Sequence, residues 1–384
     1  MDDLHRTRPT RIAIDTLPLL GQLSGVGRYI QELIHQFGRL SPQYEYFYYY
    51  GYFSRRVLLG GKSVHGIKDF VAKVPFLRTG VRGLRGTVAK YHREEFDLYF
   101  EPNFIPLDIR AKSIVTTVHD FSFARFPEAH PKERVRYFAK NFLRNVRRST
   151  RVITDSSYTK NEATEYLDIA AEMITPIHLG VDHDVFKTYP REALDICRRE
   201  LSLPERFLLF VGTREPRKNL GRLIQAYAEL PECVQQEYNL VLVGPRGWGE
   251  SDWVTAKKLG KRVMVLQYLD MQRLALTYNL ASALAYPSLY EGFGLPPLEA
   301  MACGCPVVAS HVASLPEVCG DAVCYVDPKE VQSIAGGINR VLTDDEFRRC
   351  LIQKGLERAR LFTWEKTARE TLAVFEQVVG AKRY

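Results

Sequence analysis

Short apolar runs that end in small residues alternate along this chain with segments that carry apolar residues at helical spacing. This alternation is typical of a parallel sheet with helices on both faces. It occurs twice, once in the first half of the chain and again from about residue 207. The 384 residues therefore predict an α/β protein with two doubly wound, Rossmann-like domains.

The first series predicts five strands and two prominent helices. A helix is expected to begin near Gly25, with Val26, Tyr29 and Phe37 on one face, and a long basic helix is expected over Pro131–Arg151. The expected strands are Arg11–Asp15, Tyr44–Phe53, Leu98–Glu101, Ile114–His119 and Val152–Asp155.

The second series predicts another set of buried strands, two of which run directly into a glycine. We expect one domain over residues 1–187 and a second over residues 188–362. The remaining residues, 363–384, predict a helix that either closes the second domain or crosses back to the first. The expected strands are Phe207–Gly212, Asn239–Gly244, Val263–Leu266, Ala283–Pro287 and Pro306–Ser310.

The positive charge lies mainly in the first half of the chain. Residues 1–190 contain 28 Lys and Arg against 21 Asp and Glu, whereas residues 191–384 contain 25 against 24. Two basic segments, Arg78–Arg93 and Pro131–Arg151, supply much of this excess. Each is either a solvated basic face or a contact for an anionic membrane surface or a lipid-linked diphosphate. No zinc-finger, RNP-type or basic-zipper pattern is visible, so nucleic acid is not an expected partner.

The distribution of cysteines and the sequence of the N-terminus indicate the cellular compartment. The seven cysteines all lie beyond residue 190 and are scattered, so no disulfide framework spans both halves. Met1–Arg11 is charged and has no apolar signal core, and no apolar run approaches the ~18 residues that a spanning helix needs. We expect a cytoplasmic protein whose membrane contact, if any, is peripheral and on the inner face.

The segment 289–310, LYEGFGLPPLEAMACGCPVVAS, is the most informative part of the sequence. Seven residues separate Glu291 from Glu299, and a glycine loop and two prolines between them predict the first turn of a helix. The N–H groups of Phe293, Gly294 and Leu295 would then form an anion site at the helix N-terminus. The two acids would be placed to accept hydrogen bonds from hydroxyls. The alternative is a helix cap and a solvated face.

Taken with four other motifs, this segment resembles the E-x7-E frame of retaining glycosyltransferases with the GT-B fold, in the group called family 4. The resemblance covers nearly the whole chain. The TREPRKN and VGPRGWG forms look most like the bacterial mannosyltransferase-like branch that builds surface polysaccharides. The other motifs are Phe210–Asn219 (FVGTREPRKN), His119-Asp120, Thr154–Ser157 (TDSS) and His178–Asp182 (HLGVD).

The resemblance implies that the N-terminal domain (1–187) binds the acceptor and the C-terminal domain (188–362) binds the nucleotide sugar. It also implies a role for each matching residue. Glu291 would contact hydroxyls of the transferred sugar, and Glu299 would bind the nucleotide ribose. Lys218 would bind phosphate, a role that suits its compact charge. Relatives often carry arginine where this chain has Thr213, so a second phosphate cation would come from Arg214 or Arg217; otherwise these three cations form a solvated turn.

Two further candidates lie in the first half of the chain. The resemblance places His119 against the donor sugar from the opposite domain; the alternative is a packed or solvent-facing histidine. Gly25 and Gly27 open the first predicted helix, and their N–H groups would approach the diphosphate unless they form a plain tight turn. This G-Q-L-S-G-V-G segment is not the dinucleotide fingerprint, which weakens an oxidoreductase interpretation.

The chemistry that we expect is metal-independent and needs no cofactor. The developing charge on a nucleoside diphosphate leaving group would be stabilised by Lys218, by Arg217 or Arg214, and by helix N–H groups. Cys303 and Cys305 lack a second pair at zinc spacing. The expected donor is a nucleotide sugar, GDP-mannose first and UDP-sugars second, and the expected acceptor is a glycan or lipid-linked glycan.

Two other classes of function stay open at this point. One is a different GT-B enzyme that uses a UDP-sugar or that runs a phosphorylase-like or epimerase-like reaction. The other is a non-catalytic protein that keeps the fold and binds nucleotide. The presence of Glu291, Glu299 and Lys218 argues against a protein that has lost its catalytic residues.

Overall fold

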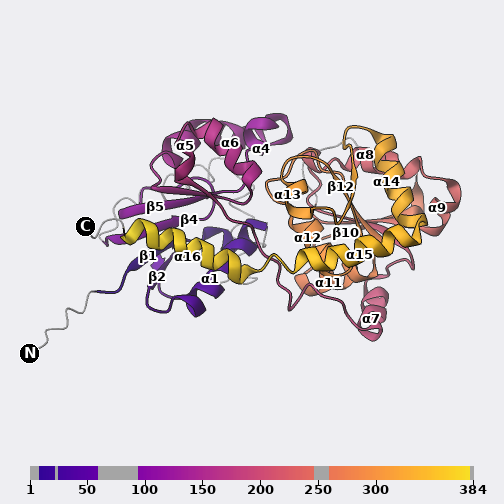
Figure 1. Cartoon of the computed structure of the whole chain (residues 1–384), viewed down its shortest axis with the longest axis horizontal. Helices are drawn as coiled ribbons and strands as arrows, with labels where there is room; N and C mark the ends of the chain where they lie inside the picture. The colour runs from indigo at the N-terminus through magenta and orange to yellow at the C-terminus, as the bar shows by residue number, and fades with distance from the viewer. Residues whose placement is uncertain (1–7, 22–24, 59–93, 246–258, 381–384) are drawn as a thin grey trace, which may run out of the picture.

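A computed structural model describes residues 8–21, 25–58, 94–245 and 259–380. Two α/β domains lie side by side, each built on its own sheet, and the chain passes from one to the other and back (Figure 1). Hydrophobic side chains from both sheets and from the helices that cover them form the cores.

The first domain contains a sheet with strand order β3-β2-β1-β4-β5-β6-β7. Its neighbouring strands pair in parallel except β2 and β3, which are antiparallel. The strands are β1 (Arg11–Asp15), β2 (Glu45–Tyr49), β3 (Phe53–Ser54), β4 (Phe96–Glu101), β5 (Ala111–Val118), β6 (Arg151–Thr154) and β7 (Ile174–Pro176).

The second domain contains an all-parallel sheet with strand order β10-β9-β8-β11-β12-β13. In both sheets the order reverses beside the first strand, between β1 and β4 and between β8 and β11. Ligands of doubly wound sheets bind beyond the carboxyl ends of the strands at this reversal. The strands are β8 (Phe207–Val211), β9 (Asn239–Val243), β10 (Val263–Leu266), β11 (Ala283–Tyr286), β12 (Val307–Ser310) and β13 (Cys324–Val326).

Helices cover both faces of each sheet, as the alternating pattern predicts (Figure 1). The α-helices are α1 (Gly25–Leu40), α4 (Ser122–Arg125), α5 (Lys132–Val146), α6 (Ser157–Leu167), α7 (Arg191–Leu201), α8 (Leu220–Ala228), α9 (Glu232–Glu237), α11 (Met271–Leu280), α12 (Leu295–Ala302), α13 (Leu315–Cys319), α14 (Val331–Thr343), α15 (Asp345–Ala359) and α16 (Trp364–Gly380). The 3-10 helices are η1 (Leu17–Leu20), η2 (Pro127–Ala129), η3 (Ala171–Met173), η4 (Pro216–Lys218) and η5 (Gly260–Arg262).

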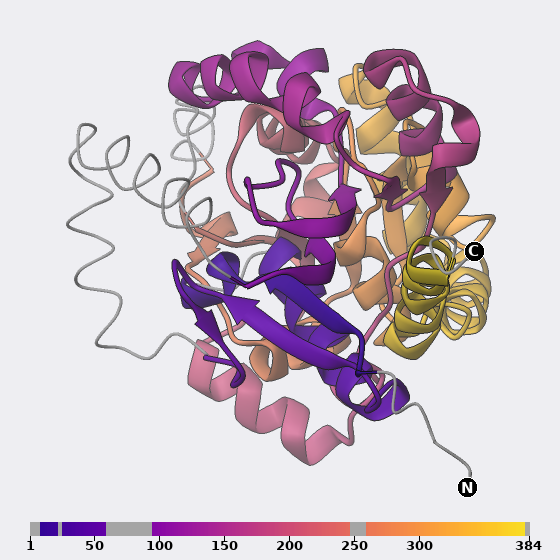
Figure 2. The same cartoon turned by 90° about the vertical axis from the view of Figure 1, so that its left-hand side faces the viewer.

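The last helix, α16, packs against the first domain although α15 belongs to the second. It contacts α1 and strands β4, β5 and β6, so it lies along the first sheet in both views (Figures 1 and 2). The Phe375 ring lies 5.5 Å from the Phe37 ring and 5.1 Å from the Phe100 ring, centroid to centroid. Ser113 Oγ also donates to Val378 O at 3.4 Å.

The structure corrects two predicted boundaries. The aromatic run Tyr44–Phe53 is not one strand but the two strands β2 and β3, because the chain turns at Gly51 with φ +93°. The basic helix over Pro131–Arg151 ends at Val146, and Arg151 begins β6 instead. The basic segment Arg78–Arg93 lies outside the described residues.

Candidate functional site

A cavity of about 540 Å³ lies between the two domains, beyond the carboxyl ends of β8 and β11. The second domain supplies most of its wall, including Lys218 after β8 and Glu291 after β11. The first domain supplies the start of α1 and His119 after β5. The point where the strand order of the second sheet reverses, its switch point, therefore opens onto this cavity. Doubly wound folds bind their ligands at such points.

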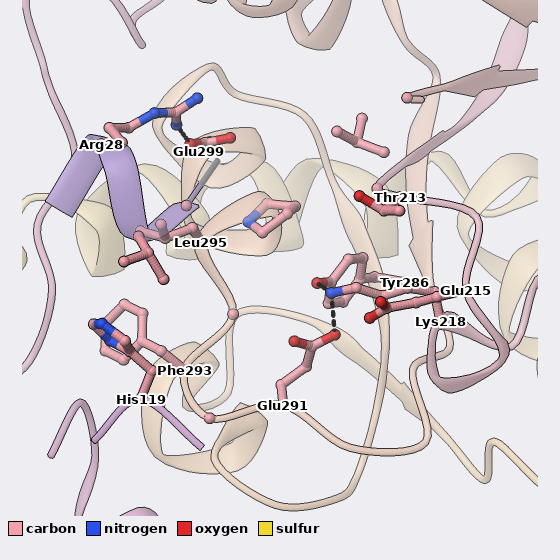
Figure 3. Close-up of a pocket in the computed structure, with 18 of the residues that line it drawn as sticks. Arg28, His119, Thr213, Glu215, Lys218, Tyr286, Glu291, Phe293, Leu295 and Glu299 are labelled. Atoms are coloured by element: carbon pink, nitrogen blue, oxygen red, sulfur yellow. Dashed lines mark hydrogen bonds and ion pairs between the residues drawn. The ribbon is translucent and has the colours of Figure 1, made fainter. Parts of the chain in front are cut away.

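Glu291 and two cations, Lys218 and Arg217, form a tight cluster on one side of the cavity, and Figure 3 shows the Lys218–Glu291 pair. Lys218 Nζ lies 2.6 Å from Glu291 Oε1, and Arg217 Nη1 lies 2.9 Å from Glu291 Oε2. Lys218 Nζ also donates to the Tyr286 hydroxyl at 2.7 Å. Arg217 binds Glu215 Oε1 as well, through Nη2 at 2.7 Å. All members come from the second domain, so this cluster is complete without the first.

The ionisation of the cluster follows from its burial and its charges. Burial alone would raise the pKa of Glu291, but Lys218 and Arg217 lower that pKa to about 2. Burial lowers the pKa of Lys218, and the adjacent Glu291 carboxylate opposes this. The Lys218 ammonium has three protons, of which Tyr286 and Glu291 take two, so one remains for a ligand anion.

Of the two candidates for the second cation, the structure places Arg217 in the cavity. Arg217 lies on the short helix η4 next to Lys218 and lines the cavity, as does Thr213. The Arg214 side chain is not among the lining residues, and its Nε donates to Pro245 O at 3.4 Å.

The loop after β11 presses against the first domain. A Cβ atom on Gly292 would lie 1.9 Å from His119 O, so only glycine allows this approach. Ser156 Oγ, from the first domain, donates to Gly292 O at 2.8 Å. Gly294 then adopts φ +112° as the residue that precedes α12. The loop that carries Glu291 is thus held by both domains.

The N-termini of α1 and α12 meet at the cavity. Gly25 begins α1 and lies close to Leu295, the first residue of α12, and both residues line the cavity with Gly294. Gly27 and Phe293 are buried, and Phe293 packs against the rings of His178 and Phe362. Two helix N-termini that meet at one cavity favour an anion here, because each is the positive end of a helix dipole.

Glu299 lies at the opposite end of the cavity from Glu291, on α12 (Figure 3). Its side chain is buried, with 4% exposed, and forms an ion pair with Arg28 of α1. The Tyr278 hydroxyl donates to its second oxygen at 3.1 Å. Sequence reasoning missed Arg28, because nothing local in the G-V-G-R segment points to an acid 271 residues away.

His119 lines the cavity, yet both its ring nitrogens are bonded within its own domain. Nδ1 lies 2.8 Å from Asp155 Oδ2, and Nε2 donates to Pro102 O at 2.9 Å. Burial lowers the pKa of His119, but the Asp155 carboxylate more than offsets this and raises it. Both nitrogens are thus occupied, and the part of His119 that meets the second domain is its backbone carbonyl, beside Gly292. Its contact with a donor sugar stays a prediction.

Other sequence candidates lie away from the cavity. Cys303 and Cys305 are buried, and burial raises the pKa of each thiol. Within the described residues, no group of three or more His, Cys, Asp or Glu side chains could hold a metal ion. None of the described helices is both long enough and apolar enough to cross a membrane.

Comparison with known proteins gives the family. The model for Glycosyltransferase Family 4 matches residues 23–185, and the model for Glycosyl transferases group 1 matches residues 197–358. O-antigen chain mannosyltransferase B of Escherichia coli is 33% identical over 379 residues, which are 95% of this chain and 99% of that protein. Serotype-specific mannosyltransferase WbdA of E. coli is 34% identical over 255 residues, which are 65% of this chain but only 31% of WbdA.

Solved structures give the fold. Sucrose-phosphate synthase from Thermosynechococcus elongatus has a TM-score of 0.69 at 21% identity, over 97% of this chain and 100% of that one. HepE of Anabaena, in complex with UDP-glucose, has a TM-score of 0.68 at 19% identity, over 96% and 99%. These likenesses confirm the predicted GT-B architecture. With both halves matched by family models and a full-length relative at 33% identity, the chain belongs to the family 4 glycosyltransferases.

Proposed function

We propose that this glycosyltransferase moves mannose from GDP-mannose, with retention at the anomeric carbon, to a hydroxyl of a glycan acceptor in surface polysaccharide synthesis. The relatives that carry the sugar assignment are named O-antigen chain mannosyltransferase B and serotype-specific mannosyltransferase WbdA. Because WbdA is about three times longer than the matched region, the first of these is the better guide. The acceptor is a growing glycan, most simply a lipid-linked one.

One observation carries the proposal. Lys218 and Arg217 form ion pairs with Glu291 at the switch point of the second sheet. The N-termini of α1 and α12 line the same cavity. Such an arrangement supplies fixed positive charge where a diphosphate would leave. We propose that Glu291, beside these cations, accepts hydrogen bonds from sugar hydroxyls. Glu299, at the far end of the cavity (Figure 3), would accept them from ribose hydroxyls.

The proposed reaction breaks the bond between the anomeric carbon and the diphosphate oxygen and forms a bond to the acceptor oxygen. The acceptor attacks from the face that the diphosphate leaves, and its proton passes to a diphosphate oxygen. Lys218, Arg217 and the helix N–H groups stabilise the GDP that departs. Glu291 and His119 position the donor and form no bond to it. The buried cluster excludes water and so strengthens each of these interactions.

A nucleotide panel tests the proposal. Thermal midpoints would be measured with GDP, UDP, ADP and dTDP and with their common sugar conjugates, since a ligand that binds the native state raises the midpoint. We expect a selective rise with GDP and GDP-mannose that Glu299→Ala abolishes. The control is Glu376→Ala, an exposed acid on α16, which should keep the rise.

Each other outcome has a defined meaning. A selective rise with UDP and a UDP-sugar would contradict the donor base and favour the UDP-sugar alternative. A response to free phosphate without a nucleotide response would favour phosphorylase-like chemistry. Binding of GDP-mannose without release of GDP in the presence of lipid-linked glycans would favour a non-catalytic nucleotide-binding protein.

We further propose that α5 rests on an anionic membrane surface. One exposed face of this helix carries four cations at intervals of four residues, namely Lys132, Arg136, Lys140 and Arg144, while its opposite face is buried. These four have no ion-pair partner among the described residues. Each cation near an anionic leaflet contributes about 1 kcal/mol of attraction. Such a surface would place a cytoplasmic enzyme beside a lipid-linked acceptor.

Vesicle flotation tests the membrane surface. We expect binding to vesicles that contain phosphatidylglycerol, weaker binding at high salt, and little binding to neutral vesicles. Replacing Lys132, Arg136 and Lys140 by glutamate should abolish it. A triple control on the second domain uses the exposed cations Lys329, Arg349 and Arg360. Equal loss in both triple variants would show that net charge alone is responsible and would contradict the proposed surface.

A further inference from the structure

Arg28 is a first-domain side chain that reaches into the second-domain end of the cavity. It lies in the first turn of α1, three residues after Gly25, and lines the cavity. Its Nη1 bonds Glu299 Oε1 on α12, so the pair crosses from one domain to the other. The side chains are 19% and 4% exposed, respectively. Figure 3 shows the two groups facing each other.

The surroundings hold Arg28 in this position. Its guanidinium carbon lies 5.4 Å from the centre of the Phe186 ring, a favourable cation–π distance. Burial lowers the pKa of Arg28, and the negative charges of Glu32 and Asp182 are among the groups that oppose this. The guanidinium stays charged because the pKa of free arginine is far above neutrality. Arg28 therefore brings a fixed positive charge to Glu299.

Glu299 depends on that charge. Within its own domain, its side chain accepts from the neutral Tyr278 hydroxyl at 3.1 Å. A carboxylate this buried is costly to keep ionised without an opposite charge. A carboxylate accepts about four hydrogen bonds, so Arg28 and Tyr278 leave room for two hydroxyl donors. The pair thus stabilises Glu299 without blocking it.

We propose that Arg28 is a positioning residue for the nucleotide, holding Glu299 ionised and oriented to accept the ribose hydroxyls only when the two domains are closed. The inference rests on the proposed function, which assigns the ribose to Glu299. It adds that ribose binding by Glu299, in the second domain, depends on Arg28 of the first domain. Nucleotide that binds to the paired Glu299 favours the closed arrangement, and closure in turn strengthens nucleotide binding.

Nucleotides that lack one ribose hydroxyl provide the test. The dissociation constants of GDP, 2′-deoxy-GDP and 3′-deoxy-GDP would be measured by calorimetry for the unsubstituted protein and for Arg28→Ala. We expect Arg28→Ala to weaken GDP binding at least about tenfold, because a charge-assisted interaction is weakened. For the deoxy analogue whose missing hydroxyl contacts Glu299, the loss should fall to about threefold or less, because that contact is already gone.

Two more variants separate this role from a structural one. Arg28→Lys keeps the charge but lacks the planar fork, so we expect an intermediate loss of GDP affinity, and it provides the test if Arg28→Ala does not fold. Arg39→Ala alters an exposed arginine in the last turn of the same helix and should leave GDP binding unchanged. Thermal midpoints without ligand show whether each variant is folded.

Several results would overturn the inference. Equal losses for GDP and for both deoxy analogues would mean that Arg28 does not act through the ribose. Tighter GDP binding by Arg28→Ala would mean that the arginine competes with the ribose for Glu299. Unchanged binding would leave a purely structural ion pair. Failure of the unsubstituted protein to bind GDP would overturn the proposed donor as well, so the two failures are distinguishable.

Discussion

The two acids of the loop-and-helix unit are neutralised in different ways. Glu291 is held by Lys218 and Arg217, which belong to the same domain. Glu299 is held by Arg28, which belongs to the other domain. The first cluster is therefore complete in the second domain alone, whereas the second exists only when the domains are together. In the proposed mechanism, the charges that stabilise the leaving group are therefore fixed within the second domain, whereas the charge that holds the ribose-binding Glu299 comes from the first domain.

Mutations around the two acids should therefore have different effects. Changes to Glu291, Lys218 or Arg217, which all belong to the second domain, should alter the chemical step with little effect on how the two domains pack together. Changes in contacts that cross between the domains should alter nucleotide binding, domain closure or stability, and should lower turnover only where they also displace Glu291. Three substitutions test this division, namely Lys218→Ala, Gly292→Ala and Glu317→Gln, in decreasing order of effect.

Lys218→Ala should have the largest effect on turnover. Lys218 is expected to stabilise the departing diphosphate, and removing one such donor from a buried site costs about 10³-fold in rate. The measurement is the rate of GDP release from GDP-mannose, with kcat and KM obtained separately. We expect the loss mainly in kcat, because the charge matters most in the transition state.

Lys366→Ala, which removes an exposed lysine on α16, is the matched control and should turn over normally. A Lys218→Ala variant with intact turnover would contradict the mechanism. A loss confined to KM would also count against it, since the lysine would then bind donor and transition state equally.

Gly292→Ala should have the next largest effect. The new Cβ would overlap His119 O, so the loop must move away from the first domain, and Glu291 must move with it. A displacement of about 1 Å at a reacting site can cost about 10²-fold in rate. The measurement is the same GDP release assay, combined with the thermal midpoint.

Gly336→Ala is the control for this change. Gly336 lies inside α14, and an added Cβ would meet nothing within 4 Å, so alanine should stabilise the helix by about 0.5–1 kcal/mol. Normal turnover by Gly292→Ala would show that the loop can yield without disturbing Glu291.

Much of the fold could be predicted because its signals are local. Apolar runs such as Phe207–Val211 and Asn239–Val243 identify buried strands by themselves. The three-residue strands β7 and β13 are too short to form a pattern, and the aromatic run before Gly51 hides a turn. These elements exist because neighbouring strands offer them hydrogen bonds, which no local sequence reveals.

The site divides in the same way. Lys218 and Glu291 follow two strand ends in one sheet, and parallel strands bring such positions together, so sequence order places them near each other. Arg28 meets Glu299 only through the arrangement of two domains. The TDSS motif is similar: Asp155 binds His119, Ser156 binds Gly292 O, and Ser157 N binds Glu317. Sequence showed the motif but not these partners.

Glu317→Gln should have the smallest effect, at a cross-domain contact outside the cavity. The Glu317 carboxylate accepts from Ser157 N at 2.8 Å and Tyr158 N at 3.1 Å, at the N-terminus of α6. Burial would raise its pKa, but the bonds from His178 and these N–H groups lower it to about 2. Since the folded pKa lies below the unfolded value of 4.5, the native state gains stability above about pH 4.5 and loses it as pH falls towards 2.

The free energy of unfolding of both proteins would be measured in urea at pH 7 and pH 3. We expect Glu317→Gln to be about 1 kcal/mol less stable at pH 7, because a neutral amide accepts more weakly from the α6 N-terminus. At pH 3 this carboxyl is protonated in the unfolded chain but still mostly ionised in the folded protein, so folding must release the proton and the gap should be smaller. Taking the difference between the two proteins removes the contribution of other acids, such as Glu291, that titrate in both. A gap of equal size at both pH values would mean that the carboxylate charge does not hold the domains together here, and that the cross-domain charge that matters is confined to Arg28.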